Sequence, residues 1–440
     1  MERIAAPTKQ AEMFCGSQKI IPGTHYRRTK HCIETICDEG RLLYHTLTGE
    51  LLLLRDDIDK TRDTDDLIRS RFLVPEETDE CKFADDFRSF LKLIQPNKKN
   101  KTTFTILTTT DCNARCFYCY EMGRKRIPMS IEKAREVASY IAEASMGEPV
   151  KIHWFGGEPL YNIPAIDTIL SGLKERGVEY ISKITTNGYY LDKTIAEKAK
   201  KEWHTQLVQI TLDGTEQIYN TTKSYIDQDH LNPYLKVMEN IGHALEEGIQ
   251  VCIRLNLDRR NAEDLLSLCD ELSAKFGRRD NLIVNIAFLQ ALEGEIHPFP
   301  SEEDAASCFL ALYDKLIKLE LTFPERLERR IRANKCMADN LSSEVILPDG
   351  RLGRCEHFSE SEIVGSMEDG ICDEDLVHSW MEIAAPFDPC RECAIYPRCI
   401  NLKKCDWNRN GCPKSTRIVR TELLKKQILR EYSEWKRNLL

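Results

Sequence analysis

The stretch TTTDCNARCFYCYE, residues 108–121, directs the interpretation of the whole chain because it holds three cysteines at the spacing C-x3-C-x2-C. These are Cys112, Cys116 and Cys119. Structural zinc sites and cubane iron–sulfur clusters normally take four protein ligands. No His or Cys follows at ligand spacing, which disfavours zinc. A metal centre held by three thiolates leaves one position for a ligand from outside the chain.

Composition describes a soluble globular protein of two or three domains, with 440 residues, 42% hydrophobic and 30% charged. The net charge of −9 disfavours a nucleic-acid binder, which needs a basic excess to neutralise phosphates. No apolar run reaches the roughly 18 residues that span a membrane. The first residues, MERIAAPTKQAEMF, lack the apolar core of a signal peptide. We therefore expect a cytoplasmic protein.

Cysteine usage is unusual, because the chain has 18 cysteines and no export signal. In a reducing compartment, clustered cysteines are typically metal ligands, whereas isolated ones such as Cys252 and Cys269 are small buried apolar residues. One cluster is the set at residues 112–119, and eight more cysteines lie between Cys336 and Cys412. Both clusters predict metal centres.

Strand and helix patterns alternate regularly through the middle of the chain. The expected strands lie at 104–110, 151–157, 184–188, 207–214, 249–258 and 281–290. Helical patterns cover 130–146, 163–177, 192–203, 235–247, 262–275 and 302–320, with Ser130 as a candidate N-cap. Six β-then-α units at this spacing predict an α/β fold with a parallel sheet, open or closed into a partial (β/α)6 barrel.

The flanking regions have different patterns. Residues 1–95 predict a small α+β module, in which 34–54 forms two strands around a Thr48-Gly49 turn. A polar stretch at 96–103 is typical of a linker, and the barrel would occupy 104–320. The cysteine-rich region 321–440 ends in TRIVRTELLKKQILREYSEWKRNLL, which has the apolar spacing of a helix.

Short polar motifs follow the predicted strands. In a parallel sheet the carboxyl ends of strands meet at one rim, where binding residues gather. Each motif alone has an ordinary alternative as a turn or a helix cap, but together with the three cysteines they favour one site. The candidates are Gly156, Gly157, Glu158 and Pro159 after strand two, Thr186 and Asn187 after strand three, Thr211 and Asp213 after strand four, and Arg254 and Asn256 near the end of strand five.

A C-x3-C-x2-C loop after the first strand, with Tyr118 before the third cysteine, resembles the radical S-adenosylmethionine (radical SAM) superfamily. The resemblance implies that Cys112, Cys116 and Cys119 hold a [4Fe–4S] cluster whose open iron is chelated by the amino and carboxylate groups of SAM. Reduction by an external donor such as flavodoxin or ferredoxin would cleave SAM. The products are methionine and a 5′-deoxyadenosyl radical, which abstracts a substrate hydrogen.

The same resemblance implies roles for the rim motifs. The stretch GGEP, residues 156–159, matches the family's second-strand motif, whose backbone meets the amino group of SAM. Ribose, carboxylate or substrate would be held at the positions of Thr186, Asn187, Thr211, Asp213, Arg254 and Asn256. The aromatic residues Trp154, Phe155 and Tyr120 would line the pocket or, alternatively, belong to the core.

The second cysteine cluster resembles the SPASM domain of peptide- and protein-modifying radical SAM enzymes. The matching residues are Cys336, Gly350, Cys355, Cys390, Cys393, Cys399, Cys405 and Cys412. The resemblance implies two auxiliary [4Fe–4S] clusters, three clusters in all, with Cys390, Cys393, Cys399 and Cys412 on the second. The first would have Cys336, Cys355 and Cys405. Its fourth ligand would be Cys372, Cys308 or a substrate thiolate.

This sequence departs from the SPASM pattern at one point. Five residues separate Cys399 from Cys405, where three are usual. The alternative for Cys390-x2-Cys393 is a structural zinc ribbon.

The N-terminal module resembles the winged-helix peptide-recognition element of ribosomal-peptide maturases, which binds a leader peptide by adding it to a strand edge. The alternative is a structural cap on the barrel. We therefore expect a radical SAM/SPASM maturase that acts on a ribosomally made precursor peptide and joins a Cys sulfur to a carbon as a thioether. Carbon–carbon crosslinking and formylglycine formation of the anaerobic sulfatase-maturase type are alternatives. A non-enzymatic Fe–S or zinc scaffold is the alternative of a different class.

Overall fold

The computed structural model describes residues 1–55, 60–95, 100–226, 232–289, 298–357, 360–382, 388–399, 402–405 and 411–439. These form two compact units. The smaller comprises Met1–Asn97, Pro324–Cys336 and Glu382–Leu440, and the larger comprises Lys98–Phe323 and Met337–Met381. Of the expected linker 96–103, residues 96–99 lie outside the described residues. The predicted domain boundaries at 95, 104 and 321 stay predictions.

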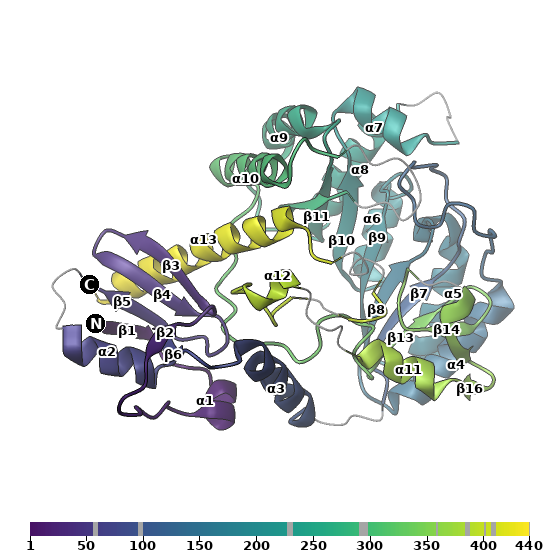
Figure 1. Ribbon diagram of the computed structural model, residues 1–440. Helices are drawn as coiled ribbons and strands as arrows, with labels where there is room; N and C mark the ends of the chain where they lie inside the picture. The colour runs from purple at the N-terminus through teal and green to yellow at the C-terminus, as the bar shows by residue number, and fades with distance from the viewer. Residues whose placement is uncertain are drawn as a thin grey trace. The chain divides into compact units, whose positions relative to one another are not determined.

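The larger unit is built on a mostly parallel sheet (Figure 1). Six parallel strands lie side by side in chain order: β7 (Thr103–Leu107), β8 (Val150–Phe155), β9 (Tyr180–Thr186), β10 (Thr205–Leu212), β11 (Gln250–Leu257) and β12 (Leu282–Phe288). Beyond β7 come β13 (Ser343–Ile346), parallel to β7, and then the antiparallel β14 (Arg351–Gly353), β15 (Ile363–Ser366) and β16 (Gly370–Ile371). The predicted α/β fold with six β-then-α units is confirmed.

Helices connect these strands as the alternation predicted. They are α4 (Ile131–Ser145), α5 (Ile163–Glu175), α6 (Lys193–Lys201), α8 (Pro233–Glu246), α9 (Ala262–Phe276) and α10 (Glu302–Lys318). The Ser130 side chain accepts the Lys133 amide at 3.1 Å, so the predicted N-cap is confirmed. Between the predicted strands of the parallel sheet, the structure adds the 3-10 turn η1 (Pro159–Asn162) and helix α7 (Glu216–Lys223), which were not predicted.

Apolar side chains cover both faces of the parallel strands, as expected for a sheet with helices packed on it. On β7, the fully buried Phe104 and Ile106 point to one face and the fully buried Leu107 points to the other. Trp154 is also fully buried, which agrees with its alternative assignment to the core.

The smaller unit contains an antiparallel sheet in the order β1 (Glu2–Ala5), β5 (Leu51–Leu54), β4 (Gly40–His45), β3 (Cys32–Cys37). A two-stranded sheet, β2 (Tyr26–Arg28) with β6 (Leu73–Pro75), and helices α1 (Lys9–Cys15), α2 (Lys60–Arg69) and α3 (Glu80–Leu93) complete its N-terminal part. The expected pair of strands around Thr48-Gly49 corresponds to β4 and β5. The first predicted strand is in fact split, because the chain turns back at Asp38-Glu39 and pairs β3 with β4.

The last helix, α13 (Lys414–Leu439), packs on this sheet (Figure 1). Leu424, Ile428 and Tyr432 share one apolar cluster with Leu42, Tyr44 and Leu53 of the sheet. The Tyr432 hydroxyl donates to Asp38 at 2.6 Å, and the Lys436 ammonium lies 2.6 Å from the same carboxylate. Segments from opposite ends of the sequence therefore share one core.

The remaining helices are η2 (Glu360–Glu362), α11 (Glu374–Met381) and α12 (Asp388–Arg391). Within the described ranges, no helix combines the length and apolar character that crossing a membrane requires.

Truncation of Ile428 tests the shared core. Ile428 is fully buried, so Ile428→Ala should lower the free energy of unfolding by about 2–5 kcal/mol. Ile36 of β3 is 77% exposed, and Ile36→Ala should change stability by less than about 0.5 kcal/mol. Urea unfolding of both variants, at matched metal content, measures the difference. Equal stability of the two variants would contradict the packing of α13 on the sheet.

Candidate functional site at the rim of the parallel sheet

The three-cysteine loop leaves the end of β7 and is closed at its base by backbone hydrogen bonds. The Met129 amide donates to Thr108 at 2.9 Å, and the Thr110 amide donates to Ile127 at 3.0 Å. Within the loop, the Cys119 amide donates to the Cys116 carbonyl at 3.1 Å. The cysteine side chains are partly exposed. The loop therefore presents its three thiols from a fixed base at the rim.

Two glycines allow the end of β8 to approach this loop. The amides of Gly157 and Glu158 donate to the carbonyls of Thr109 and Asp111 at 3.0 and 2.9 Å. A Cβ on Gly156 would lie 2.2 Å from the Thr109 carbonyl oxygen, and one on Gly157 would lie 2.2 Å from that of Asp111. Both contacts are with backbone that has no room to move aside. Because these amides serve the loop, an amino group bound here would use carbonyl oxygens of the motif.

Glu158 joins three rim segments. Its side chain is fully buried, and one oxygen accepts the Leu160 amide at 3.0 Å and the Thr186 hydroxyl at 2.6 Å. The other oxygen accepts the Asn187 amide at 2.7 Å. Burial raises the pKa of Glu158 to about 7, against the effect of these donors. The hydroxyl of Thr186 therefore donates to Glu158, and its expected contact with ribose, carboxylate or substrate stays a prediction.

Asn187 connects the end of β9 to the first cysteine. Its Nδ2 donates to Asn113 at 2.7 Å and lies 3.7 Å from the Cys112 sulfur. The Ala114 amide also points at this sulfur, at 3.3 Å. N–H donors favour the thiolate form of a cysteine. Burial has the larger effect and raises the pKa of the Cys112 thiol above its ordinary value.

A buried polar network lies behind the loop. The Tyr118 hydroxyl donates to both carboxylate oxygens of Asp213, at 3.0 and 2.9 Å. The Lys223 ammonium lies 3.0 Å from Asp213 and 3.0 Å from the Tyr118 oxygen. The side chains of Lys223 and Asp213 are only 5% and 2% exposed. Burial lowers the pKa of Lys223, but Asp213 and its other neighbours raise it well above the ordinary value.

The network continues to the predicted residues of β11. Asn256 donates to Asp213 at 3.2 Å, and Arg254 donates to Asn256 at 3.0 Å. Thr211 lies opposite Arg254 in the pairing of β10 with β11. The structure thus groups Tyr118, Asp213, Asn256 and Arg254, and it groups Cys112 with Asn187 and Glu158. Lys223 was missed, since a single lysine at the end of a short helix has no distinguishing pattern.

Two of the aromatic candidates lie beside the loop. The Tyr120 ring packs edge-on against His357, with ring centroids 4.2 Å apart. It is stacked on Phe155 at 6.4 Å. They form one aromatic group next to the third cysteine.

Among the described residues, no three His, Cys, Asp or Glu side chains converge as they would on a single metal ion. A cubane cluster has a different requirement, because each thiolate binds a separate iron and the sulfurs surround the cluster. The three thiols of this loop, with two N–H donors at Cys112, fit such a group.

The cysteines of the second cluster are distributed over both units. Cys390, Cys393 and Cys399 pack in one apolar cluster of the smaller unit with Phe87 and Tyr396. Cys412, Cys405 and Cys336 belong to the same unit, whereas Cys355 belongs to the larger one. Cys372 is exposed after β16, and Cys308 is partly exposed on α10. The ligand sets predicted for two auxiliary clusters stay predictions.

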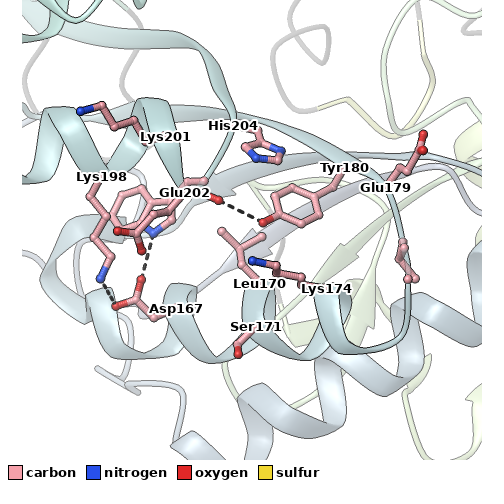
Figure 2. Close-up of a pocket in the computed structure, with 13 residues that line it drawn as sticks. Asp167, Leu170, Ser171, Lys174, Glu179, Tyr180, Lys198, Lys201, Glu202 and His204 are labelled. Atoms are coloured by element: carbon pink, nitrogen blue, oxygen red, sulfur yellow. Dashed lines mark hydrogen bonds and ion pairs between the residues drawn. The ribbon is translucent and has the colours of Figure 1, made fainter.

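One cavity is remote from the cysteine loop. It has a volume of about 890 Å³ and lies between the ends of α5 and α6 and the start of β9 (Figure 2). Asp167 bridges Lys198 at 2.6 Å and the Trp203 indole at 2.9 Å at its wall. Parallel strands end at the opposite rim, so this cavity is not part of the candidate site. A cavity of about 300 Å³ does adjoin the loop, lined by Phe117, Tyr118, Asp213, Arg260, Asn261 and Leu289 among others.

The model of the radical SAM superfamily matches residues 106–272. The chain is 28% identical over 185 residues to Fe-coproporphyrin III synthase of Methanosarcina barkeri. These aligned residues make up 41% of this chain and 43% of that protein. It is 25% identical to a probable GTP 3′,8-cyclase of Methanococcus maripaludis over 58% of this chain and 79% of that protein. The alignment thus spans less than half of the synthase.

Solved structures show the same fold. The structure of anSMEcpe with bound AdoMet aligns with a TM-score of 0.59 and 14% identity, over 76% of this chain and 96% of that one. The structure of anSMEcpe with AdoMet and the Cp18Cys peptide aligns with a TM-score of 0.56 and 14% identity. The alignment covers 76% of this chain and 99% of that one. At this identity the likeness concerns the fold alone.

Removing Lys223 should expose the dependence of the site on its ion pair. Lys223→Met leaves the Asp213 carboxylate buried without its cation, which should cost about 3–5 kcal/mol of unfolding free energy. Lys223→Met combined with Asp213→Asn should recover part of that loss. Urea unfolding of the four proteins gives the coupling energy. The exposed pair Lys201–Glu197 is the control, and Lys201→Met should cost less than about 1 kcal/mol. Equal losses at the two lysines would contradict the arrangement.

Glu158 should make stability depend on pH. Its pKa is raised from 4.5 to about 7, so the native state holds the proton more tightly than the unfolded state. This contribution to stability is complete below about pH 4.5 and is lost as the pH rises through 7, at about 1.4 kcal/mol per pKa unit. Glu158→Gln should abolish this pH dependence.

Unfolding free energies at pH 5 and pH 8 measure the effect. The exposed Glu175→Gln variant should follow the wild type at both pH values. If wild type and Glu158→Gln have the same pH dependence, protonation of Glu158 does not contribute to the unfolding free energy.

Proposed function

We propose that Cys112, Cys116 and Cys119 hold a [4Fe–4S] cluster to which S-adenosylmethionine binds, because they lie in residues 106–272, which match the model of the radical SAM superfamily. The superfamily uses this cofactor pair. The observation that carries the proposal is the arrangement of the rim. The loop with three thiols is closed at its base by hydrogen bonds within its own backbone, and the amides of Gly157 and Glu158 donate to it. The Asn187 side chain at the end of β9 donates to the Cys112 sulfur.

When bound, the cluster and SAM would supply a 5′-deoxyadenosyl group able to abstract a hydrogen atom from an unreactive carbon. The residues of the chain hold the rim of the site in place and orient its side chains. Glu158 fixes the end of β8 to β9, and Asn187 positions the Cys112 side chain. The Asp213–Lys223 pair fixes the Tyr118 ring at the wall of the cavity beside the loop.

The same cavity has the chemistry to receive the adenosine end of SAM. Its wall includes the Phe117 ring, with the Arg260 guanidinium 4.1 Å from the ring centroid. Asp213 and Asn261 contribute polar groups. Aromatic and cationic surfaces with a few polar groups are typical of sites for planar heterocycles.

We further propose that the substrate is a ribosomally made peptide and that the product is a thioether between a Cys sulfur and a carbon. The likeness of fold to anSMEcpe, whose structure holds the Cp18Cys peptide, supports a peptide substrate. The α+β module at 1–95 supports a leader-binding role. Formylglycine formation is the second candidate reaction. A thioether forms with loss of two hydrogens. The carbon loses one as an atom, and the thiol loses a proton and passes one electron to an auxiliary cluster.

The three reactions leave different products. A thioether lacks two hydrogens and has no free thiol, a carbon–carbon crosslink lacks two hydrogens and keeps the thiol, and formylglycine made from Cys lacks the sulfur. The auxiliary clusters on Cys390, Cys393, Cys399 and Cys412 and on Cys336, Cys355 and Cys405 belong to this proposal. So do the external electron donor and the cytoplasmic location.

Anaerobic reconstitution tests the proposal. The wild type should bind about twelve irons, from three four-iron clusters, and should cleave SAM to 5′-deoxyadenosine on reduction. A variant with Cys112, Cys116 and Cys119 replaced by Ala should keep about eight irons and form no 5′-deoxyadenosine. Cys269→Ala, at a buried cysteine of α9, should match the wild type in both respects. Zinc in place of iron, or cleavage that ignores the three cysteines, would overturn the proposal.

A further inference from the structure

The two faces of the parallel strands differ in their charge. Side chains alternate between the faces along each strand. On one face, Ile152 of β8, Ile184 of β9 and Ile210 of β10 are almost completely buried. The opposite face, called the inner face below, carries the residues that alternate with these. Its basic side chains are Lys151, His153, Lys183 and Arg254, and none of the strands β7 to β12, all of which the structure describes, contains Asp or Glu.

The inner face is continuous with the rim that carries the cysteine loop. Asn187, whose side chain lies 3.7 Å from the Cys112 sulfur, follows β9 directly. Thr185 and Lys183 precede it by two and four residues, so their side chains leave the strand on the same side. Four residues of strand correspond to about 13 Å. A substrate with its reacting carbon at the rim can therefore extend along the inner face to Lys183.

Lys183 is a cation without a close counter-ion. It lies in the middle of β9, opposite His153 of β8 on one side and Leu207 of β10 on the other. The residue is exposed, yet its neighbours exclude enough water to lower the pKa of the ammonium, and the attraction of the Glu356 carboxylate acts in the other direction. No carboxylate among the residues that the structure describes forms an ion pair with Lys183.

The neighbours of Lys183 on the inner face do not compensate its charge. His153 Nε2 shares a hydrogen bond of 2.8 Å with the Thr185 hydroxyl. Burial and the charge of Lys183 lower the pKa of His153 to about 3, so the imidazole is neutral near pH 7. The Arg254 guanidinium is higher on the face, where it donates to Asn256. Lys183 is thus the cation that an anion halfway along the face would meet.

A carboxylate is the anionic group that a ribosomally made peptide offers to such a cation. Hydrogen bonds between an ammonium and a carboxylate are roughly twice as strong as those between neutral groups. The carboxylate can belong to an Asp or Glu side chain or to the C-terminus of the peptide. An extended peptide covers about 13 Å with four residues, which sets the spacing between the carboxylate and the reacting carbon.

We propose that Lys183 binds a carboxylate of the substrate peptide, about four residues or fewer from the reacting carbon, and so determines which segment of the peptide enters the site. The proposal rests on the proposed function, which supplies the peptide. It assigns to the middle of β9 a part in substrate selection that is separate from the cluster and from SAM.

A selection from synthetic peptides tests the proposal. The library holds nine-residue peptides with Cys at the fifth position and varied residues elsewhere, made once with a C-terminal amide and once with a free C-terminal carboxylate. The anaerobically reconstituted full chain with SAM captures peptides in solution, and mass spectrometry identifies them. Amidated peptides with Asp or Glu should be enriched at least tenfold over their Asn or Gln counterparts, which corresponds to about 1.4 kcal/mol.

Matched variants separate the charge of Lys183 from other effects. Lys183→Met should lose the enrichment, and Lys183→Glu should reverse it in favour of peptides with Lys or Arg. Because Lys183 is exposed, both variants should unfold at the urea concentration of the wild type. Lys201→Met is the control, because Lys201 is 63% exposed on α6 and pairs with Glu197. It should keep the enrichment of the wild type.

The outcomes are distinct. Enrichment of Asp or Glu that is lost in Lys183→Met supports the proposal with a side-chain carboxylate. Enrichment of free-acid over amidated peptides, lost in the same variant, supports it with the C-terminal carboxylate. If Lys183→Met does not fold, Lys183→Gln decides in its place.

Two results would contradict the proposal. A preference for acidic peptides that persists in Lys183→Met, or captured peptides without such a preference, overturns it and leaves the proposed function intact. If the wild type cleaves SAM but captures no peptide, the peptide substrate is wrong, and the role of Lys183 with it.

Discussion

The site depends on a close approach between two backbones. The loop that carries the three cysteines and the end of β8 are joined by amides of Gly157 and Glu158, and the space between them excludes a single Cβ at either glycine. Glu158 extends this contact to β9 by accepting the Thr186 hydroxyl and the Asn187 amide. Three strand ends are thereby fixed to one another before any ligand binds.

Behind that contact, buried polar side chains satisfy one another. Asp213 accepts the Tyr118 hydroxyl and the Asn256 amide and pairs with Lys223, so a carboxylate and an ammonium are tolerated out of water. The network occupies the ends of β10 and β11 and the helix α7 that follows β10. It gives the rim a rigid wall, which is what positioning a reactive group requires.

Much of the fold was predictable, because alternating strands and helices with short connections leave few topologies. The rim motifs were predictable for the same reason, since the carboxyl ends of parallel strands must meet. Individual roles were not. The hydrogen bond from the Thr186 hydroxyl to Glu158 was not foreseen, and the ionic partner of Asp213 is Lys223, whose position has no sequence pattern. The turn at Asp38-Glu39 was missed because apolar residues continue on both sides of it.

The apolar spacing of the last segment predicted the helix α13 but not its packing on β3 and β4, because periodicity marks an apolar face without identifying what covers it. This packing has a consequence for biosynthesis. On the ribosome, the first strands of the smaller unit emerge long before Leu424, Ile428 and Tyr432, and domains generally fold as units. The barrel can fold during translation, whereas the sheet of the smaller unit must await the last helix with one apolar face uncovered. The apolar face formed by Leu42, Tyr44 and Leu53 therefore stays uncovered until residues 424–432 have been made.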